Sequence, residues 1–448
     1  MSKAYEVNFD GIVGLTHNYS GLSFGNVASL MNKEVPSNPK QAALQGLDKM
    51  KYLSDMGIKQ GILLPQERPH IPTLKALGFS GNDEHILKAA FKYSKALLHA
   101  CSSTSSMWAA NAATVSPSAD SDDRKLHITP ANLTSKFHRS IEPAITSKMF
   151  NVIFSDTDLF TVHPILPPSN YFTDEGAANH TRFCKEFGGK GVQLFCYGKY
   201  GFRDNQVTRF PARQSFEASE AIARLHQLES KQVIFAKQNP KAIDAGVFHN
   251  DVISVGHQNV FLYHEEAFAN TPEIIAELEQ ALRAVCRTNL IAIKVPSSRI
   301  TLEDAVKTYL FNSQIVTLPD ASMRLVAPSE CQESDNVRQF IDEMIASSTN
   351  PINSVKYMNL HQSMRNGGGP ACLRLRIVLN EQELNKCNQN FILNDELYKK
   401  LVKWVNKHYR DQLLPHDLTD ISLLNETRTA LDELTKLLKT GPIYDFQR

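Results

Sequence analysis

The chain has 448 residues, of which 42% are hydrophobic and 21% charged, so it can bury a large core. Its 48 Lys and Arg residues balance 47 Asp and Glu residues, and the net charge of +1 lacks the basic excess of nucleic-acid-binding proteins and favours a small-molecule substrate. An apolar signal segment and a run of about eighteen apolar residues are both absent from the sequence, so we expect a cytoplasmic protein without membrane contact.

Helical and strand patterns alternate along the chain, which predicts a mixed α/β fold. Helices are expected to begin at Asn38-Pro39, Thr271-Pro272 and Thr301, where capping residues precede helix-forming segments. Strands are expected at 150–154, 191–195, 232–235, 260–263, 290–293 and 373–378. Near the C-terminus, helical spacing predicts a core-facing helix through Leu397, Leu401, Trp404 and Val405.

Two polar segments in the first third of the chain, 17–29 and 102–114, are rich in small residues. The first offers backbone and hydroxyl groups to a ligand, although an isolated stretch of this kind is more often a surface loop. The second fits either a loop or a pocket wall.

Two further segments carry acid and base groups. In 173–180, Asp174 and Asn179 suit helix capping, which leaves Glu175 as the candidate catalytic carboxylate. In 245–253, His249 and Asp251 are two residues apart and share one face if the segment is extended. Histidine titrates near neutral pH and suits proton transfer, but a satisfied surface pair is an alternative interpretation.

The most distinctive segment is Asn366-Gly367-Gly368-Gly369-Pro370-Ala371-Cys372. Three glycines remove most steric restriction from the backbone, and Pro370 stiffens the approach to a cysteine at the start of a strand. A flexible connector followed by a buried, inert cysteine is the alternative. A histidine and a carboxylate elsewhere in the chain favour a nucleophilic Cys372.

The seven cysteines are widely spaced and include no CxxC pair, so the sequence supports neither a disulfide framework nor a zinc ribbon. It also lacks the phosphate-binding GxxxxGK[ST] and GxGxxG motifs. We therefore expect catalysis without a metal or an organic cofactor.

Together these segments, with Phe137-His138-Arg139, Asn111 and Arg213, resemble the N-succinylarginine dihydrolases over essentially the whole chain. The resemblance implies a pentein-type pseudo-fivefold α/β propeller of repeated strand and helix units, formed as a single catalytic domain with peripheral insertions across residues 1–448. It also implies a homodimer.

The resemblance further implies site roles. Cys372 corresponds to the nucleophile, and His249 and Glu175 correspond to the other catalytic residues. The implied substrate-binding residues are Ser20, Gly21, Leu22, Ser23, Phe24, Gly25, Asn26, Val27, Ala28, Ser29, Asn111, His138, Arg139, Arg213, Asp251 and Asn366. Val27 departs from the polar residue that the family pattern leads us to expect, which affects one peripheral contact.

The implied reaction hydrolyses N2-succinylarginine to N2-succinylornithine, two ammonia molecules and carbon dioxide through a covalent adduct on Cys372. Three alternatives remain from the residue types alone. They are an arginine-deiminase-like enzyme that stops at the ureido product, a non-catalytic binding protein of the same fold, and a papain-like amidase, whose cysteine signature is missing from this sequence.

Overall fold

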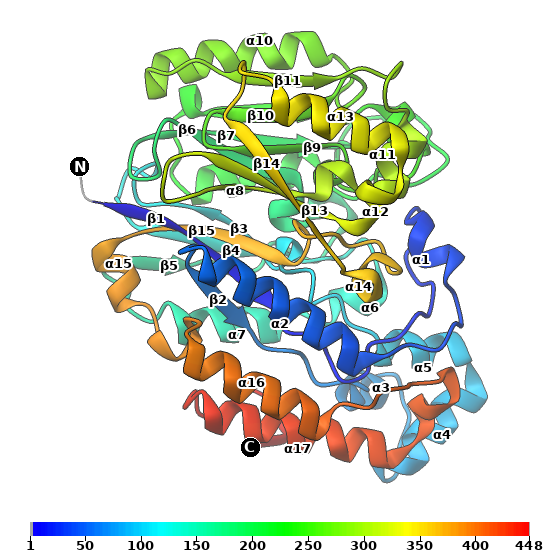
Figure 1. Ribbon diagram of the computed structural model, residues 1–448. Helices are drawn as coiled ribbons and strands as arrows, with labels where there is room; N and C mark the ends of the chain where they lie inside the picture. Colours follow the sequence, from blue (N-terminus) through cyan, green and yellow to red (C-terminus); the bar gives the residue numbers. More distant parts are fainter. Residues whose placement is uncertain (1–2, 448) are drawn as a thin grey trace.

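The computed structural model describes residues 3–447 and contains five three-stranded sheets (Figure 1). In each sheet the central strand is antiparallel to one neighbour and parallel to the other. The strands are, sheet by sheet, β15 (Arg374–Asn380), β1 (Ala4–Gly11) and β2 (Gln60–Leu63); β3 (Ala113–Ser116), β4 (Leu126–Pro130) and β5 (Phe160–Val162); β6 (His180–Cys184), β7 (Gly191–Tyr197) and β8 (Val233–Lys237); β9 (Ser254–His257), β10 (Val260–His264) and β11 (Ile291–Val295); β12 (Gln314–Thr317), β13 (Met323–Pro328) and β14 (Ile352–Met358).

One ββαβ module is repeated five times. Two antiparallel strands are followed by a helical crossover, which a parallel third strand requires. The crossover helices are α2 (Pro39–Asp55), α7 (Pro143–Ile153), α8 (Phe216–Leu225), α10 (Thr271–Ala281) and α13 (Asp335–Ala346). The first module takes its antiparallel strand from the end of the chain, so that β1 and β15 lie side by side (Figure 1). The predicted pentein-type propeller is therefore confirmed.

The remaining helices connect or cover the modules. They are α1 (Val27–Met31), α3 (Ile71–Ala76), α4 (Asp83–Tyr93), α5 (Lys95–Ser102), α6 (Phe137–Ser140), α9 (Pro240–Asp244), α11 (Leu302–Thr308), α12 (Ser329–Glu333), α14 (His361–Met364), α15 (Glu381–Lys386), α16 (Asp395–His408) and α17 (Ile421–Leu437). The predicted apolar face of α16 is buried between α2 and α17, and Nε1 of Trp404 donates a 2.9 Å hydrogen bond to the carbonyl of Ala430 (Figure 1). No helix within residues 3–447 is long and apolar enough to cross a membrane.

Five of the six predicted strands are confirmed, as β7, β8, β10, β11 and β15. The prediction for 150–154 is wrong, because this segment ends α7. Met149, Phe150 and Ile153 are buried on one helical face, so the apolar run belongs to a 3.6-residue repeat that continues from earlier in the chain. The expected helix start at Thr271-Pro272 is confirmed, since α10 begins at Thr271 with Asn270 as its N-cap.

A short turn precedes the first strand of each module. These turns are η1 (Ala109–Asn111), η3 (Gly176–Asn179), η5 (Asn250–Val252), η7 (Leu310–Asn312) and the loop 366–373 before β15. Neighbouring turns are joined by hydrogen bonds, namely Asn111 Nδ2 to Glu175 O, Asn250 N to Asn179 Oδ1, Asn312 Nδ2 to Asp251 O, Ala371 N to Asn312 O and Ala110 N to Cys372 O. The repeated topology thus gathers five segments, far apart in sequence, around one site.

Candidate active site

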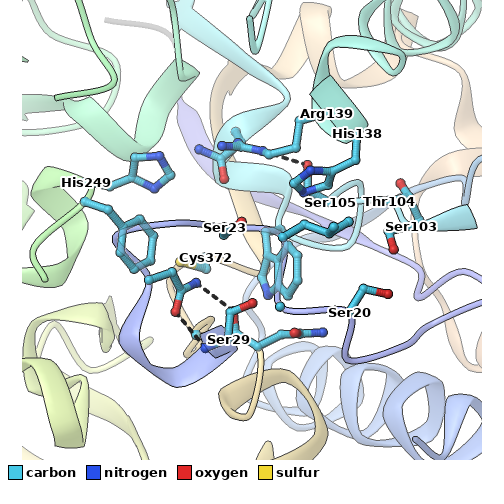
Figure 2. Close-up of a pocket in the computed structure, with 18 of the residues that line it drawn as sticks. Ser20, Ser23, Ser29, Ser103, Thr104, Ser105, His138, Arg139, His249 and Cys372 are labelled. Carbon is cyan, nitrogen blue, oxygen red and sulfur yellow. Dashed lines mark hydrogen bonds between the residues drawn. The ribbon is translucent and has the colours of Figure 1, made fainter. Parts of the chain in front are cut away.

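A cavity lies over these turns (Figure 2). Its wall combines the N-terminal loop, the segment before η1, helix α6, the segment around Arg213 and the loop that ends at Cys372. The lining residues are Asn18, Ser20, Gly21, Leu22, Ser23, Asn26, Ser29, Ser103, Thr104, Ser105, Trp108, Asn111, His138, Arg139, Arg213, Phe248, His249, Asn366, Gly367 and Cys372. Most of the lining residues carry polar side chains, and the cysteine and histidine singled out from the sequence face the cavity together.

The three glycines before Cys372 are closely packed rather than free to move. A Cβ atom on Gly367 would lie 2.3 Å from Oδ1 of Asn26, and Gly367 also has a φ of +80°. A Cβ atom on Gly368 would lie 1.9 Å from Nε1 of Trp108. Only glycine permits this close approach of backbone to side chain, so the triplet fixes the position of the cysteine.

Cys372 is buried, and its sulfur contacts two polar side chains. Nδ2 of Asn312 donates to Sγ at 3.0 Å, and Sγ donates to Oδ2 of Asp251 at 3.3 Å. Burial and the Asp251 carboxylate raise the pKa of the Cys372 thiol well above its ordinary value of 9.0, while the Asn312 amide opposes this shift. The thiol is therefore protonated at neutral pH in the free protein and needs a further positive charge nearby to ionise.

His249 is held by Glu175. Nε2 of His249 lies 2.7 Å from Oε2 of Glu175, whose carboxylate also accepts hydrogen bonds from Arg139 and Ser135. Burial acts to raise the pKa of Glu175, but Arg139 and His249 together hold that pKa well below 4.5. Burial lowers the pKa of His249 to about 4, so the imidazole is neutral and available as a base.

Asp251 accepts a hydrogen bond from the sulfur of Cys372 through Oδ2, and its Oδ1 atom is buried. Within residues 3–447, Oδ1 of Asp251 has no hydrogen-bond partner. Burial raises the pKa of this carboxyl to about 6, which leaves it mostly ionised at neutral pH. The sequence-based picture of His249 and Asp251 on one face of an extended segment is wrong, because Asp251 lies in the turn η5 and bonds to Cys372, whereas His249 bonds to Glu175.

Arg213 is a buried cation on the cavity wall. Its guanidinium lies 4.6 Å from the ring centre of Phe248, and its Nη2 atom has no hydrogen-bond partner in the described part of the chain. Burial lowers the pKa of Arg213 to about 10, so the group remains charged at neutral pH. Nη2 of Arg139 also lacks a partner among residues 3–447. Both arginines can therefore donate to an anionic group of a ligand.

The surroundings of these arginines add positive potential. Burial and the neighbouring Arg213 lower the pKa of Lys136 to about 8. Burial together with Arg139 and Arg213 lowers the pKa of His138 far below 6.5, so this side chain remains neutral. This part of the cavity favours anions, whereas the carboxylate beside Cys372 favours a cation.

Comparisons with known proteins identify the family. A family model described as succinylarginine dihydrolase matches residues 3–447. The N-succinylarginine dihydrolases of Pseudoalteromonas atlantica and Shewanella putrefaciens are 54% and 55% identical to this chain over 448 residues, with 100% of both chains covered. This chain belongs to the succinylarginine dihydrolase family. The resemblance seen in the sequence is thus confirmed.

Among solved structures, the N-terminal domain of ArgZ, an arginine dihydrolase from cyanobacteria, aligns with a TM-score of 0.49. Its sequence identity is 14%, and the alignment covers 83% of this chain and 97% of that domain.

The structure brings most of the residues implied by the succinylarginine dihydrolase pattern to the cavity. Those on its wall are Cys372, His249, Ser20, Gly21, Leu22, Ser23, Asn26, Ser29, Asn111, His138, Arg139, Arg213 and Asn366. Glu175 and Asp251 do not line the wall but contact His249 and Cys372 from behind.

Four implied residues, Phe24, Gly25, Val27 and Ala28, do not line the cavity. Phe24 is half exposed and packs edge-on against Phe210 at a ring-centre distance of 5.1 Å. Val27 begins α1 and packs against the core, which accounts for the apolar residue at this position.

Sequence reasoning missed seven lining residues, which are Asn18, Ser103, Thr104, Ser105, Trp108, Phe248 and Gly367. The segment 102–114 was open to interpretation as a pocket wall, and its small hydroxyl residues were the available signal. Among residues 3–447, no group of three or more His, Cys, Asp and Glu side chains has an arrangement suited to a metal ion.

Proposed function

We propose that the chain hydrolyses N2-succinylarginine with two water molecules to N2-succinylornithine, two ammonia molecules and carbon dioxide, in arginine catabolism through the succinyltransferase pathway. One observation carries the proposal. A buried cysteine shares a cavity with a neutral histidine and donates to the Asp251 carboxylate, whose Oδ1 atom has no hydrogen-bond partner among residues 3–447, as is also the case for Nη2 of Arg213 on the cavity wall. This pattern of charge is complementary to a guanidinium joined to carboxylates, and the family supports the same substrate.

The substrate binds with its cationic and anionic groups in two regions of opposite electrostatic potential, one at Asp251 and the other at Arg139 and Arg213. The flat guanidinium donates to Asp251, whose free Oδ1 atom is desolvated and therefore gains strongly from a charge-assisted bond. The carboxylates of the substrate accept from Arg213 and from the free Nη2 atom of Arg139. Glu175 is not available to the guanidinium, because its oxygens are already bonded to Arg139, His249 and Ser135.

Attack begins when the bound cation lowers the pKa of the neighbouring thiol. Cys372 transfers its proton to His249, and the thiolate forms a C–S bond with the guanidinium carbon. His249 then gives this proton to one nitrogen of the tetrahedral adduct, the C–N bond breaks, and ammonia leaves. The product of this half-reaction is a thiouronium adduct on Cys372.

Hydrolysis uses the same histidine as a base. His249 removes a proton from water, the hydroxyl attacks the adduct carbon, and the C–S bond breaks to give the ureido compound. In the second round Cys372 attacks the ureido carbon and a second ammonia leaves. Water then hydrolyses the thiocarbamate to a carbamate, which loses carbon dioxide to give N2-succinylornithine.

A deiminase that stops after one round is the nearest alternative, because its first half-reaction uses the same groups. A non-catalytic binding protein of this fold is disfavoured by the joint placement of Cys372, His249 and Glu175. The homodimer implied by the family resemblance and the cytoplasmic location expected from the lack of a signal segment stay predictions.

Ammonia release from N2-succinylarginine, measured beside release from free arginine, tests the proposal. We expect rapid release from the succinylated substrate and at least about 100-fold lower kcat/KM for free arginine, which lacks the remote carboxylate and so loses contacts worth several kcal/mol. Equal use of the two compounds contradicts the proposed substrate. Release from neither compound contradicts the proposed activity.

A further inference from the structure

We propose that Asn312 is a catalytic residue that stabilises the thiolate of Cys372, an inference that rests on the proposed function. The predicted site residues do not include it. Its side chain is fully buried and makes two hydrogen bonds to Cys372.

The orientation of the Asn312 amide is fixed by its partners. The backbone N–H of Cys372 donates to Oδ1 of Asn312 at 3.0 Å, and a backbone N–H can only donate. The other end of the amide is therefore the NH₂ group, which donates to Sγ of Cys372 at 3.0 Å and to the carbonyl of Asp251 at 3.2 Å. One side chain thus holds the backbone of the nucleophile and points a donor at its sulfur.

The charge around the sulfur explains why such a donor is needed. Burial and Asp251 both oppose formation of the thiolate, and Asp251 has to remain anionic to bind a guanidinium. The Asn312 amide opposes that effect without adding a charge that would repel the cationic substrate. Hydrogen bonds to an ionised acceptor are stronger than those to a neutral one, so this contact favours the thiolate over the thiol.

The position of Asn312 in the fold supports the same role. The turn η1 carries Asn111, η3 directly follows Glu175, and η5 carries Asp251. The loop before β15, which belongs to the first module, contributes Cys372. The turn η7 occupies the corresponding place in the remaining module, and Asn312 is its last residue. The turn of each of the five modules therefore brings a polar group to the site that contains the sulfur of Cys372.

The variant Asn312→Asp tests the proposal, because it keeps the shape and the Oδ1 acceptor but replaces the donor with an anionic oxygen. Alkylation of Cys372 by iodoacetamide, followed by peptide mass spectrometry between pH 6 and 10, reports thiolate formation without any substrate. We expect the midpoint of the alkylation rate against pH to rise by about one pH unit or more. At a fixed pH below the pKa of the thiol, such a rise corresponds to an alkylation rate about tenfold lower than in the wild type. With N2-succinylarginine, kcat should fall about 100-fold, as for loss of a donor to a developing charge, while KM changes little.

Two further variants make the result specific. Asn388→Asp makes the same chemical change in a partly buried asparagine that does not line the cavity, and it should leave both the profile and kcat as in the wild type. Asp251→Asn removes the anion beside the sulfur and should shift the alkylation profile to lower pH, opposite to Asn312→Asp.

If Asn312→Asp does not fold, Asn312→Ser gives the same comparison with a smaller shift in the same direction. A folded Asn312 variant with a wild-type alkylation profile and wild-type kcat overturns the proposal. If instead the profile shifts but the wild-type protein does not hydrolyse N2-succinylarginine, the role of Asn312 at the thiol stands and the proposed function fails.

Discussion

Nε2 of His249 and Oε2 of Glu175 are 2.7 Å apart in the interior of the protein. A carboxylate with a low pKa can only accept, so the ring proton of the neutral histidine is on Nε2. Nδ1 of His249, which has no hydrogen-bond partner within residues 3–447, is then the basic nitrogen. In the proposed mechanism, Glu175 thus acts as a positioning residue, because it selects the tautomer of His249 that performs proton transfer.

Replacement of Glu175 by Gln is expected to reduce both stability and turnover. The change leaves the buried guanidinium of Arg139 without its anionic partner, which costs about 3–5 kcal/mol for a broken buried pair. A lower midpoint in urea unfolding and a loss of ammonia release would both be seen. Glu229→Gln, which affects a solvent-exposed ion pair, is the matched control and should leave the urea midpoint close to that of the wild type.

The buried Glu175 carboxylate predicts a pH dependence of stability. The pKa of Glu175 is lower in the folded state than its ordinary value of 4.5, so in acidic solution the unfolded chain binds more protons at this residue than the folded chain does. Its contribution to stability is complete above pH 4.5 and is lost as the pH falls below that value. The wild type should therefore lose more stability than Glu175→Gln when unfolding is compared at pH 7 and at pH 4.

The variant His249→Asn is expected to bind substrate and to accumulate an adduct on Cys372. The thiol can still attack the bound guanidinium slowly, but the hydrolytic step lacks its base. Intact-protein mass spectrometry after mixing with N2-succinylarginine should show a mass increase located at Cys372. Unmodified protein together with wild-type turnover would remove His249 from the mechanism.

The variant Cys372→Ser is expected to abolish turnover with the fold intact. A serine hydroxyl is much less acidic than a thiol, and the buried site gives it no means of ionising. Cys387→Ser changes a buried cysteine that does not line the cavity and should retain wild-type kinetics. A substantial fraction of wild-type ammonia release from the Cys372→Ser variant would show that the nucleophile is another group.

Arg213→Ala is expected to lower kcat/KM for N2-succinylarginine about 100-fold or more, because a desolvated charge-assisted contact costs several kcal/mol when one partner is removed. Arg213→Lys should restore only part of the loss, since Lys lacks the two parallel donors of a guanidinium. Arg209→Ala, at an exposed neighbouring position, should behave as the wild type in the same steady-state assay. Wild-type kinetics for Arg213→Ala would exclude the anion site.

Apolar periods are local signals, and they predicted a mixed α/β chain with most of its strands and helices. The repeated modules of the propeller were implied by the family resemblance and not by these periods. The prediction from apolar periods failed at 150–154, where five apolar and polar residues resemble a strand when separated from the helical repeat that begins at Pro143. The five turns that converge on the site carry no comparable local signal, since their association depends on contacts between distant modules.

Individual site residues were likewise predictable only where the sequence around them carries a local motif. Cys372 and His249 were found from their motifs, and the glycine triplet marked the loop that carries the nucleophile. Asn312 lies in an ordinary segment before a strand, and only the folded chain shows that its amide contacts the sulfur. Trp108 was likewise unrecognised, although its indole explains why position 368 is a glycine.

The ratio of ammonia to N2-succinylornithine tests the central claim most directly. Complete conversion of a known amount of N2-succinylarginine by the purified chain, with products quantified by mass spectrometry and ammonia by an enzymatic assay, gives this ratio in one experiment. Two rounds of hydrolysis on Cys372 predict two ammonia molecules for each N2-succinylornithine formed, without accumulation of the ureido compound. One ammonia molecule per substrate, with the ureido compound as the final product, would contradict the account and identify the chain as a deiminase.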